Sequence, residues 1–267
     1  MPPLDEKGFL GKEVEQWIPR IRNAHKGLFV LADEVNEYCQ KAMYKFEAHN
    51  KDKQEVLVST LYIRTLNNYQ ASILLAERGM MPQSRVIVRA MVEALFSLCA
   101  IAKSEKYADD FILEDQKNRL KYLNKFRQLH GGLPPDANKE EVELLEKQLK
   151  EEIRAGEIKE KSTEQWSKDA GMHDWYLTAY SVLSATVHSK VKDLERYLAL
   201  NDKNEIVEFR WGPDDHDVEE ILMTLIQGML TALNCERSLF EQKQESEVSD
   251  FQERLNSLVK ERLVASD

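Results

Sequence analysis

The stretch PQSRVIVRAMVEALFSLCAIAK, residues 82–103, decides the fold. Within residues 86–102 almost every side chain is apolar, so a helix built from them is apolar nearly all the way round. Such a helix is covered by neighbours on most sides. Polar residues recur along it at every fourth position: Arg85, Arg89, Glu93 and Ser97. The stretch therefore predicts a central helix that carries one polar ribbon.

The composition favours an α-helical protein. Of 267 residues only 10 are Gly and 7 are Pro, whereas 42% are apolar and 31% are charged. Scarce turn residues and abundant charge favour helices over strands, and the length is compatible with one core. We expect an all-α fold in which residues 1–267 form a single helical bundle domain.

Turn signals and helical spacing place the neighbouring helices. A helix over 53–78 should end at Gly79, because glycine readily adopts the left-handed conformation after a helix. Pro82 suits the first turn of the next helix, so GMMP predicts a tight turn between antiparallel helices. Near the start of the sequence, Pro19 removes a backbone donor and should force a kink or a restart of the helix. Further core helices are expected at about 174–191 and 216–244.

Residues 104–165 have a different character from the rest of the chain. A polar helical segment over 104–130 precedes the loop GGLPPDAN, and the highly charged KEEVELLEKQLKEEIRAGEIKEK follows with a narrow apolar stripe. This pattern is typical of two helices that pair along a seam with solvated outer faces. We expect a projecting, charged helical hairpin inserted into the bundle. Two short apolar runs around NDKN predict a small β-hairpin near 198–210.

Charge and cysteine content argue against several classes of function. The net charge is −10, whereas duplex coating requires many Lys and Arg residues, so generic duplex DNA binding is not expected. Without a polybasic tract or a long uncharged apolar segment, we expect no membrane association and a cytoplasmic protein. The cysteines have no CxxC spacing, which favours reduced, buried thiols: Cys39, Cys99 and Cys235. We expect no metal and no cofactor, because zinc-ligand spacing and phosphate-binding glycine motifs are missing from the sequence.

A second polar stripe lies in YSVLSATVHSK, residues 180–190. Tyr180, Ser184 and His188 recur every four positions among apolar neighbours. Two arginines beside an imidazole would supply an anion subsite and a general acid or base, a combination suited to a phosphate ester. The alternative is an ion-pair network that fixes helix register, with His188 as a satisfied core histidine. The sequence leaves open whether the two stripes meet.

Two segments resemble a bacterial, all-helical family known as domain of unknown function 5677. They are LNNYQASILLAERGMMPQSRVIVRAMVEALFSLCAIA (66–102) and YSVLSATVHS (180–189). The family pattern is a glycine turn, an Arg-x-x-x-Glu helix and a downstream Ser-x-x-x-His, represented here by Gly79, Arg89, Glu93, Ser184 and His188. The resemblance covers about 53–102 and 175–240 and leaves out the charged hairpin.

The expected arrangement of helices is also similar to HEPN domains, helical bundles that include many metal-independent RNases of toxin and anti-phage systems. Their signature is Arg followed by His after four to six residues. The chain has this spacing at Arg20–His25 and Arg210–His216. We interpret both matches as chance, because neither arginine precedes the usual polar residue. The resemblance nevertheless implies action on RNA or another phosphoester.

Two functions of different classes are therefore expected. The first is a HEPN-like, metal-independent hydrolase of RNA or phosphoesters in bacterial defence. Its catalytic residues would be His188 as general acid or base, Arg89, Glu93 and Ser184, and its binding residues would be Arg85 and Tyr180. The second is a non-catalytic interaction or regulatory protein whose ribbon is structural. The expected partners are RNA or a small phosphate-bearing ligand for the first, and a second copy or another protein on the 104–165 arm for the second.

Overall fold

The computed structural model describes residue 4 and residues 6–133, 137–155, 160–187, 191–242 and 246–265. Its α-helices are α1 (Val14–Ala24), α2 (Lys26–Met43), α3 (Lys53–Ala76), α4 (Met81–Lys103), α5 (Glu105–His130), α6 (Lys139–Ala155), α7 (Thr163–Asp169), α8 (His173–Trp175), α9 (Ser181–Val187), α10 (Val191–Leu194), α11 (Val218–Leu239) and α12 (Ser246–Ala265). The remaining elements are the 3-10 helices η1 (Gly8–Leu10) and η3 (Glu195–Tyr197), the π-helical turn η2 (Tyr176–Tyr180), and strands β1 (Leu198–Leu200) and β2 (Ile206–Phe209). The prediction of an all-α bundle with a small β-hairpin is confirmed.

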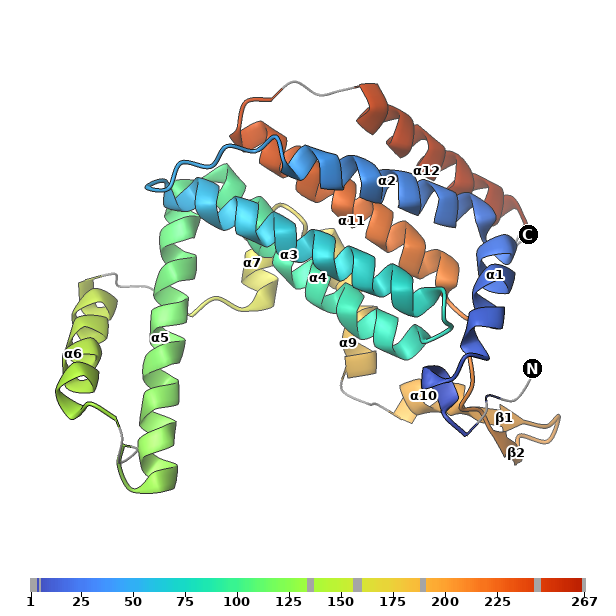
Figure 1. Cartoon of the computed structure of the whole chain (residues 1–267), viewed down its shortest axis with the longest axis horizontal. Helices are drawn as coiled ribbons and strands as arrows, with labels where there is room; N and C mark the ends of the chain where they lie inside the picture. Colours follow the sequence, from blue (N-terminus) through green and yellow to red (C-terminus); the bar gives the residue numbers. More distant parts are fainter. Residues whose placement is uncertain are drawn as a thin grey trace.

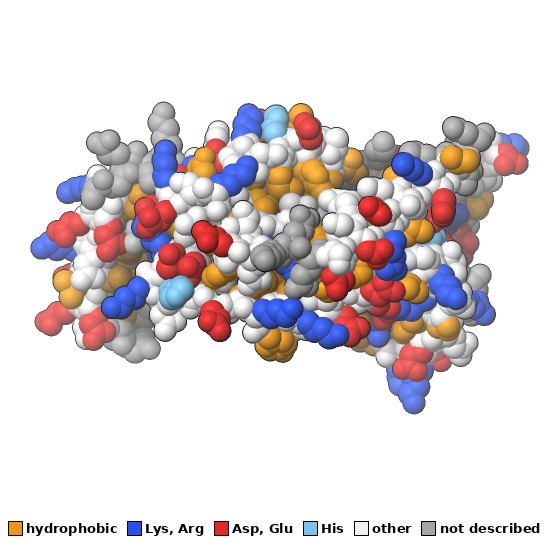
Figure 2. Space-filling view, turned by 90° about the horizontal axis from the view of Figure 1, so that it is seen from above, with side chains coloured by type: hydrophobic (Ala, Val, Ile, Leu, Met, Phe, Trp, Pro, Cys, Tyr) orange, Lys and Arg blue, Asp and Glu red, His pale blue; other side chains and the backbone are white. Residues whose placement is uncertain are grey.

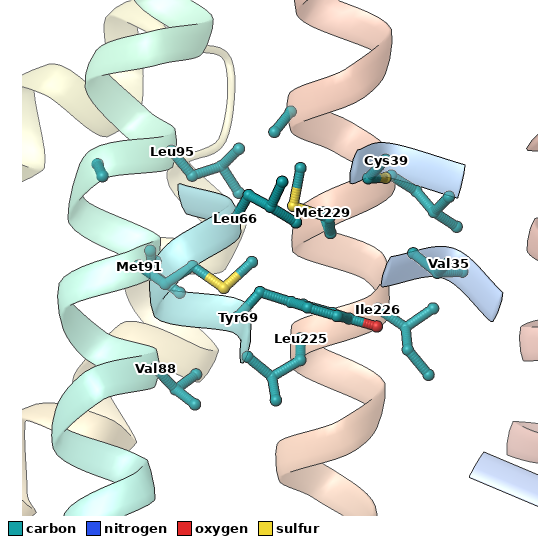
Figure 3. Close-up of a cluster of buried hydrophobic side chains, with 14 of the residues drawn as sticks. Val35, Cys39, Leu66, Tyr69, Val88, Met91, Leu95, Leu225, Ile226 and Met229 are labelled. Carbon is teal, nitrogen blue, oxygen red and sulfur yellow. The ribbon is translucent and has the colours of Figure 1, made fainter. Parts of the chain in front are cut away.

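Helix α4 is the central element of the bundle (Figure 1). It packs against α3 and α11 along its length and against α5, α7 and α9 on other sides. Figure 3 shows the resulting core, in which side chains of four helices interdigitate: Val35 and Cys39 of α2, Leu66 and Tyr69 of α3, Val88, Met91 and Leu95 of α4, and Leu225, Ile226 and Met229 of α11. Neighbours on several sides explain why residues 86–102 are apolar almost all the way round.

Two buried tyrosines connect α3 to α2. The hydroxyl of Tyr62 donates to the backbone carbonyl of Cys39 at 3.1 Å, and that of Tyr69 donates to the carbonyl of Ala32 at 2.7 Å. A buried hydroxyl without a partner destabilises a fold. These two hydrogen bonds therefore allow large aromatic rings to fill the core while their polar ends remain satisfied.

The turn between α3 and α4 depends on Gly79, as the sequence predicts. Gly79 has φ +72°, and its carbonyl accepts a hydrogen bond from the backbone N–H of Asp214 at 2.9 Å. A Cβ atom on Gly79 would lie 2.7 Å from that nitrogen and equally close to Pro213. Both the left-handed conformation and the close approach require glycine. The turn consequently holds the loop that precedes α11.

The predicted restart of the helix at Pro19 is wrong. Helix α1 continues through Pro19, and the break falls at His25, whose φ of −116° and ψ of 37° separate α1 from α2. Proline removes one helical hydrogen bond, but Val14 and Ile21 of α1 are buried, so packing compensates for the loss. His25 Nδ1 also lies 3.0 Å from Glu219 of α11, which holds the chain at the actual break.

Helices α5 and α6 lie side by side and extend away from the bundle as a hairpin (Figure 1). Arg127 of α5 and Glu146 of α6 form an ion pair between the two helices at 2.5 Å. The base of the hairpin is braced by Lys53 of α3, which pairs with Asp109 at 2.5 Å. The chain then returns to the body at α7, where the buried Trp166 donates through Nε1 to a carboxylate of α5.

Strands β1 and β2 form an antiparallel two-stranded sheet. Leu198 pairs with Phe209 and Ala199 with Glu208, and the register shifts by one residue before Leu200. Most of the hairpin is exposed, and it lies at the end of the bundle opposite to α5 and α6 (Figure 1). Within the described ranges, no helix combines the length and the apolar composition that crossing a membrane requires.

Candidate functional site

The two polar stripes meet on α4, with Arg89 at the centre. Its Nε donates to the hydroxyl of Ser184 in α9 at 3.0 Å, and its Nη2 donates to the hydroxyl of Tyr180 in η2 at 2.6 Å. Arg89 also pairs with Glu93, one helical turn along α4, at 3.0 Å. We refer to these four residues, Arg89, Glu93, Tyr180 and Ser184, as the Arg89 cluster.

Tyr180 closes the Arg89 cluster. Its hydroxyl donates to Glu93 Oε1 at 2.7 Å, and the guanidinium carbon of Arg89 lies 4.8 Å from the centre of its ring. Burial, and secondarily the hydrogen bond to Glu93, raise the pKa of Tyr180. The phenol therefore stays protonated at neutral pH and can donate to the carboxylate.

The π-helical turn η2 precedes α9 directly. A π-turn inserts one extra residue and often occurs at functional sites. The ring of Tyr180 stacks on that of Tyr176 at a centroid distance of 5.2 Å, so both ends of this turn are held together. The residues that follow in α9 then direct Ser184 toward Arg89. Local helix geometry and the aromatic stack thus position half of the cluster.

Arg85 belongs to a second group of charged residues one turn before the Arg89 cluster. Its Nε donates to Thr186 Oγ1 at 3.0 Å and its Nη1 donates to Asp217 Oδ2 at 2.7 Å. The same carboxylate oxygen of Asp217 accepts a hydrogen bond from Arg196 at 3.0 Å. Thr186 in turn donates to Asp193 at 3.0 Å. We refer to Arg85, Thr186, Asp193, Arg196 and Asp217 as the Arg85 cluster.

Four members of the Arg85 cluster were not expected from the sequence. Thr186 lies two residues after Ser184. Its polar side chain among apolar neighbours could have identified it as a site residue from the sequence. Asp193 and Arg196 are three residues apart, a spacing that favours pairing on a helix. Asp217 gave no comparable signal, because it reaches Arg85 from a loop 132 residues away in sequence.

Ser97 takes no part in the contacts of either cluster, and the structure does not describe His188. Ser97 is buried, and its hydroxyl donates to the backbone carbonyl of Glu93 in its own helix at 3.4 Å. This bond satisfies the hydroxyl locally, so the far end of the ribbon is structural. His188, which the sequence suggests as the general acid or base, lies outside the described residues.

The charges in both clusters are compensated but not sealed from solvent. The side chain of Arg85 is 12% exposed and that of Arg89 is 20% exposed, whereas Glu93 is 35% exposed. Each of the two arginines faces a carboxylate, which offsets the cost of burying its charge. On the face seen in Figure 2, acidic and basic side chains are likewise interspersed. Water and small solutes can reach the Arg89 cluster, but its net charge is close to zero.

A cavity of about 900 Å³ adjoins the Arg85 cluster through Arg196, which lines it. Its walls include the aromatic side chains of Tyr197, Phe209 and Trp211 and the charged groups of Glu195, Glu208, Arg210, Asp214, Asp215 and His216. Arg210 and His216, which match the HEPN spacing, therefore share this cavity rather than the Arg89 cluster. In the part of the chain that the structure describes, no group of three or more His, Cys, Asp and Glu residues is arranged to hold a metal ion.

Comparison with known proteins assigns the chain to a family. The model of a family of unknown function, DUF5677, matches residues 55–206, more than half of the chain. The matched segment contains the whole Arg89 cluster and ends before Asp217. Comparisons with curated proteins and with solved structures find no match. The chain therefore belongs to the DUF5677 family.

Proposed function

We propose that this protein is a metal-independent hydrolase of RNA or a related phosphoester, the activity expected from the resemblance to HEPN domains that the sequence suggests. The observation that carries the proposal is the convergence of Glu93, Tyr180 and Ser184 on Arg89. A guanidinium held by three partners is pre-organised, and this one remains 20% exposed. Pre-organised donors that face a developing negative charge are a principal source of catalysis.

Each residue of the proposed site has a distinct role. Arg89 binds the scissile phosphate, because its planar fork can donate two hydrogen bonds to phosphate oxygens. Glu93 and Tyr180 orient the guanidinium, and the hydroxyl of Ser184 accepts the hydrogen bond from its Nε. His188 follows Ser184 by four residues in the sequence and would act as general acid or base, since imidazole titrates near neutral pH.

The neighbouring cavity supports a substrate larger than phosphate. Its volume of about 900 Å³ lies within the usual range for small-molecule sites. Trp211 and Phe209 line it, and aromatic rings in such places stack on nucleobases. Arg196 belongs to both the cavity and the Arg85 cluster, so a bound nucleotide would extend from the cavity toward Arg85.

Charge compensation favours a second, non-catalytic function. Arg85 pairs with Asp217 at 2.7 Å and Arg89 with Glu93 at 3.0 Å, so a phosphate would compete with carboxylates already in place. In this alternative the clusters fix α4 against α9 and α11. The protein would then be an interaction or regulatory module that binds its partner elsewhere, for example on the α5–α6 hairpin.

The experiment that separates these functions measures cleavage and stability on the same variants. The full chain is incubated with end-labelled single-stranded RNA and chelator, and Tm is recorded by calorimetry. The variants are His188→Ala and Arg89→Ala, with Ser184→Ala compared against Ser181→Ala. Ser181 is a suitable control because it is exposed in the same helix and its hydroxyl donates to the carbonyl of Tyr176.

For the hydrolase, His188→Ala should reduce cleavage about 100-fold or more while leaving Tm nearly unchanged. Ser184→Ala should reduce cleavage and Ser181→Ala should not. For the structural alternative, the wild-type chain should show no cleavage above the background. Arg89→Ala would then destabilise the fold by about 1–2 kcal/mol, since Glu93 loses its cationic partner but keeps the hydrogen bond from Tyr180 and remains partly hydrated. Cleavage by the wild type that persists in both His188→Ala and Arg89→Ala would refute the proposed site.

A further inference from the structure

Two cysteines from different core helices lie next to each other. Cys99 of α4 and Cys235 of α11 are 136 residues apart in sequence, and their sulfur atoms are 2.8 Å apart. Both are free thiols, and they share a hydrogen bond. A disulfide requires a sulfur–sulfur distance of about 2.05 Å, so only a small adjustment of the two side chains separates this pair from bonding distance.

The surroundings give the two thiols different roles. Cys99 is buried, whereas Cys235 is partly accessible. The hydrogen bond shared with Cys99 lowers the pKa of Cys235, and Lys103, one turn along α4 from Cys99, acts in the same direction. The same hydrogen bond and burial raise the pKa of Cys99. Cys235 is therefore the thiol that forms the nucleophilic thiolate, since reactivity follows thiolate character and access.

We propose that Cys99 and Cys235 form an oxidative modification site, which closes to an intrachain disulfide when the protein meets a peroxide. The Cys235 thiolate attacks one peroxide oxygen, the O–O bond breaks, and hydroxide leaves, which gives a sulfenic acid. The sulfur of Cys99 then attacks the sulfur of Cys235. The S–O bond breaks, the proton of Cys99 goes to the departing hydroxyl, and water is released. The peroxide is reduced and the two thiols are oxidised.

The third cysteine provides an internal control. Cys39 of α2 is fully buried, and burial raises its pKa to about 12. Its sulfur lies beside the core side chains of α2 and α11 in Figure 3. A thiol of this kind is inert toward peroxide, because almost none of it is ionised. Selective oxidation should therefore remove two of the three thiols and leave Cys39 intact.

The bond would join the central helix to α11. The loop that it closes contains the α5–α6 hairpin, η2 and α9, and with them Tyr180 and Ser184. Closing so long a loop restricts the unfolded chain and stabilises the fold. For a chain of this size we expect Tm to rise by about 5–10 °C on oxidation. The modification would thus change the stability of α4, η2 and α9, the three elements that carry the Arg89 cluster.

The test treats the full chain with about a tenfold excess of hydrogen peroxide, followed by denaturation and alkylation of the remaining thiols. We expect one alkylated cysteine, a loss of about 2 Da before alkylation, and a peptide that links Cys99 to Cys235 and disappears with dithiothreitol. Cys39→Ser should behave like the wild type. Cys235→Ser should form no bond and show no rise in Tm. Cys99→Ser should instead accumulate oxygen adducts on Cys235.

Three outcomes would overturn the proposal. They are three alkylated cysteines after peroxide treatment, oxygen adducts on Cys235 of the wild type without a linked peptide, and a bond that joins two chains. Folding of the variants does not confound the result, because the wild type alone gives the linked peptide or fails to give it.

Discussion

Glu236 of α11 should make the fold less stable as pH rises. Its side chain is fully buried, and neither carboxyl oxygen has a hydrogen-bond partner among the described residues. Burial raises its pKa from 4.5 to about 9, although the positive charge of Arg237 opposes the shift. The unfolded chain loses this proton near pH 4.5, whereas the folded chain keeps it to about pH 9. The proton on Glu236 therefore makes its full contribution to stability below pH 4.5. Between pH 4.5 and pH 9 the free energy of unfolding falls by about 1.4 kcal/mol per pH unit as this contribution is lost.

Replacing Glu236 by Gln removes this ionisation from both states. At about pH 7 the variant should be more stable than the wild type by about 3 kcal/mol, and the difference should nearly vanish close to pH 4.5. Urea unfolding between about pH 5 and pH 8 measures the free energy of unfolding for both proteins. Glu253→Gln, at an exposed position of α12, controls for the loss of one charge. A difference that does not change with pH, or that Glu253→Gln reproduces, would refute the reasoning.

Two further predictions concern local conformation. Gly79→Ala should lower the free energy of unfolding by about 3 kcal/mol, because it adds a backbone clash to a left-handed residue. Gly131→Ala has a similar φ of +66° and nothing within 4 Å, so it should cost only about 1 kcal/mol in the same urea titration; equal losses would contradict the role of the clash. Asp52→Ala removes the side chain that accepts hydrogen bonds from the first backbone N–H groups of α3. It should cost about 1 kcal/mol by chemical denaturation, whereas the exposed Lys51→Ala should cost nothing measurable.

The sequence predicted the elements whose signals are local. The apolar run of 86–102 identified α4 as central because periodicity directly reports how many sides of a helix are covered. Gly79 and the charged hairpin were likewise recognisable from single stretches of chain. Pro19 was misjudged, because the burial of Val14 and Ile21 depends on packing that a local pattern does not contain. Propensity is a weak guide wherever tertiary contacts compensate for it.

The candidate site was predictable only in part. Spacing by four identified Arg89, Glu93, Tyr180 and Ser184 on two helices, but contact between those helices required the fold. The pairing of Arg85 with Asp217 is a non-local contact that a single sequence does not encode in any motif. Glu236 did carry a signal, because it follows Leu233 by three residues on the apolar face of α11. That spacing is typical of a buried position, but the burial of this charged residue was not predicted.

The separation of α4 from α11 along the chain has a consequence for biosynthesis. Helix α4 ends at Lys103 and α11 begins at Val218, so the ribosome adds about 115 residues between them. At typical elongation rates the nascent chain spends roughly 6–25 s with α3 and α4 synthesised and α11, the second helix that packs along α4, still missing. Exposed apolar surface on such intermediates promotes aggregation. We therefore expect the newborn α1–α4 segment to be prone to aggregation until α11 emerges and covers its apolar surface.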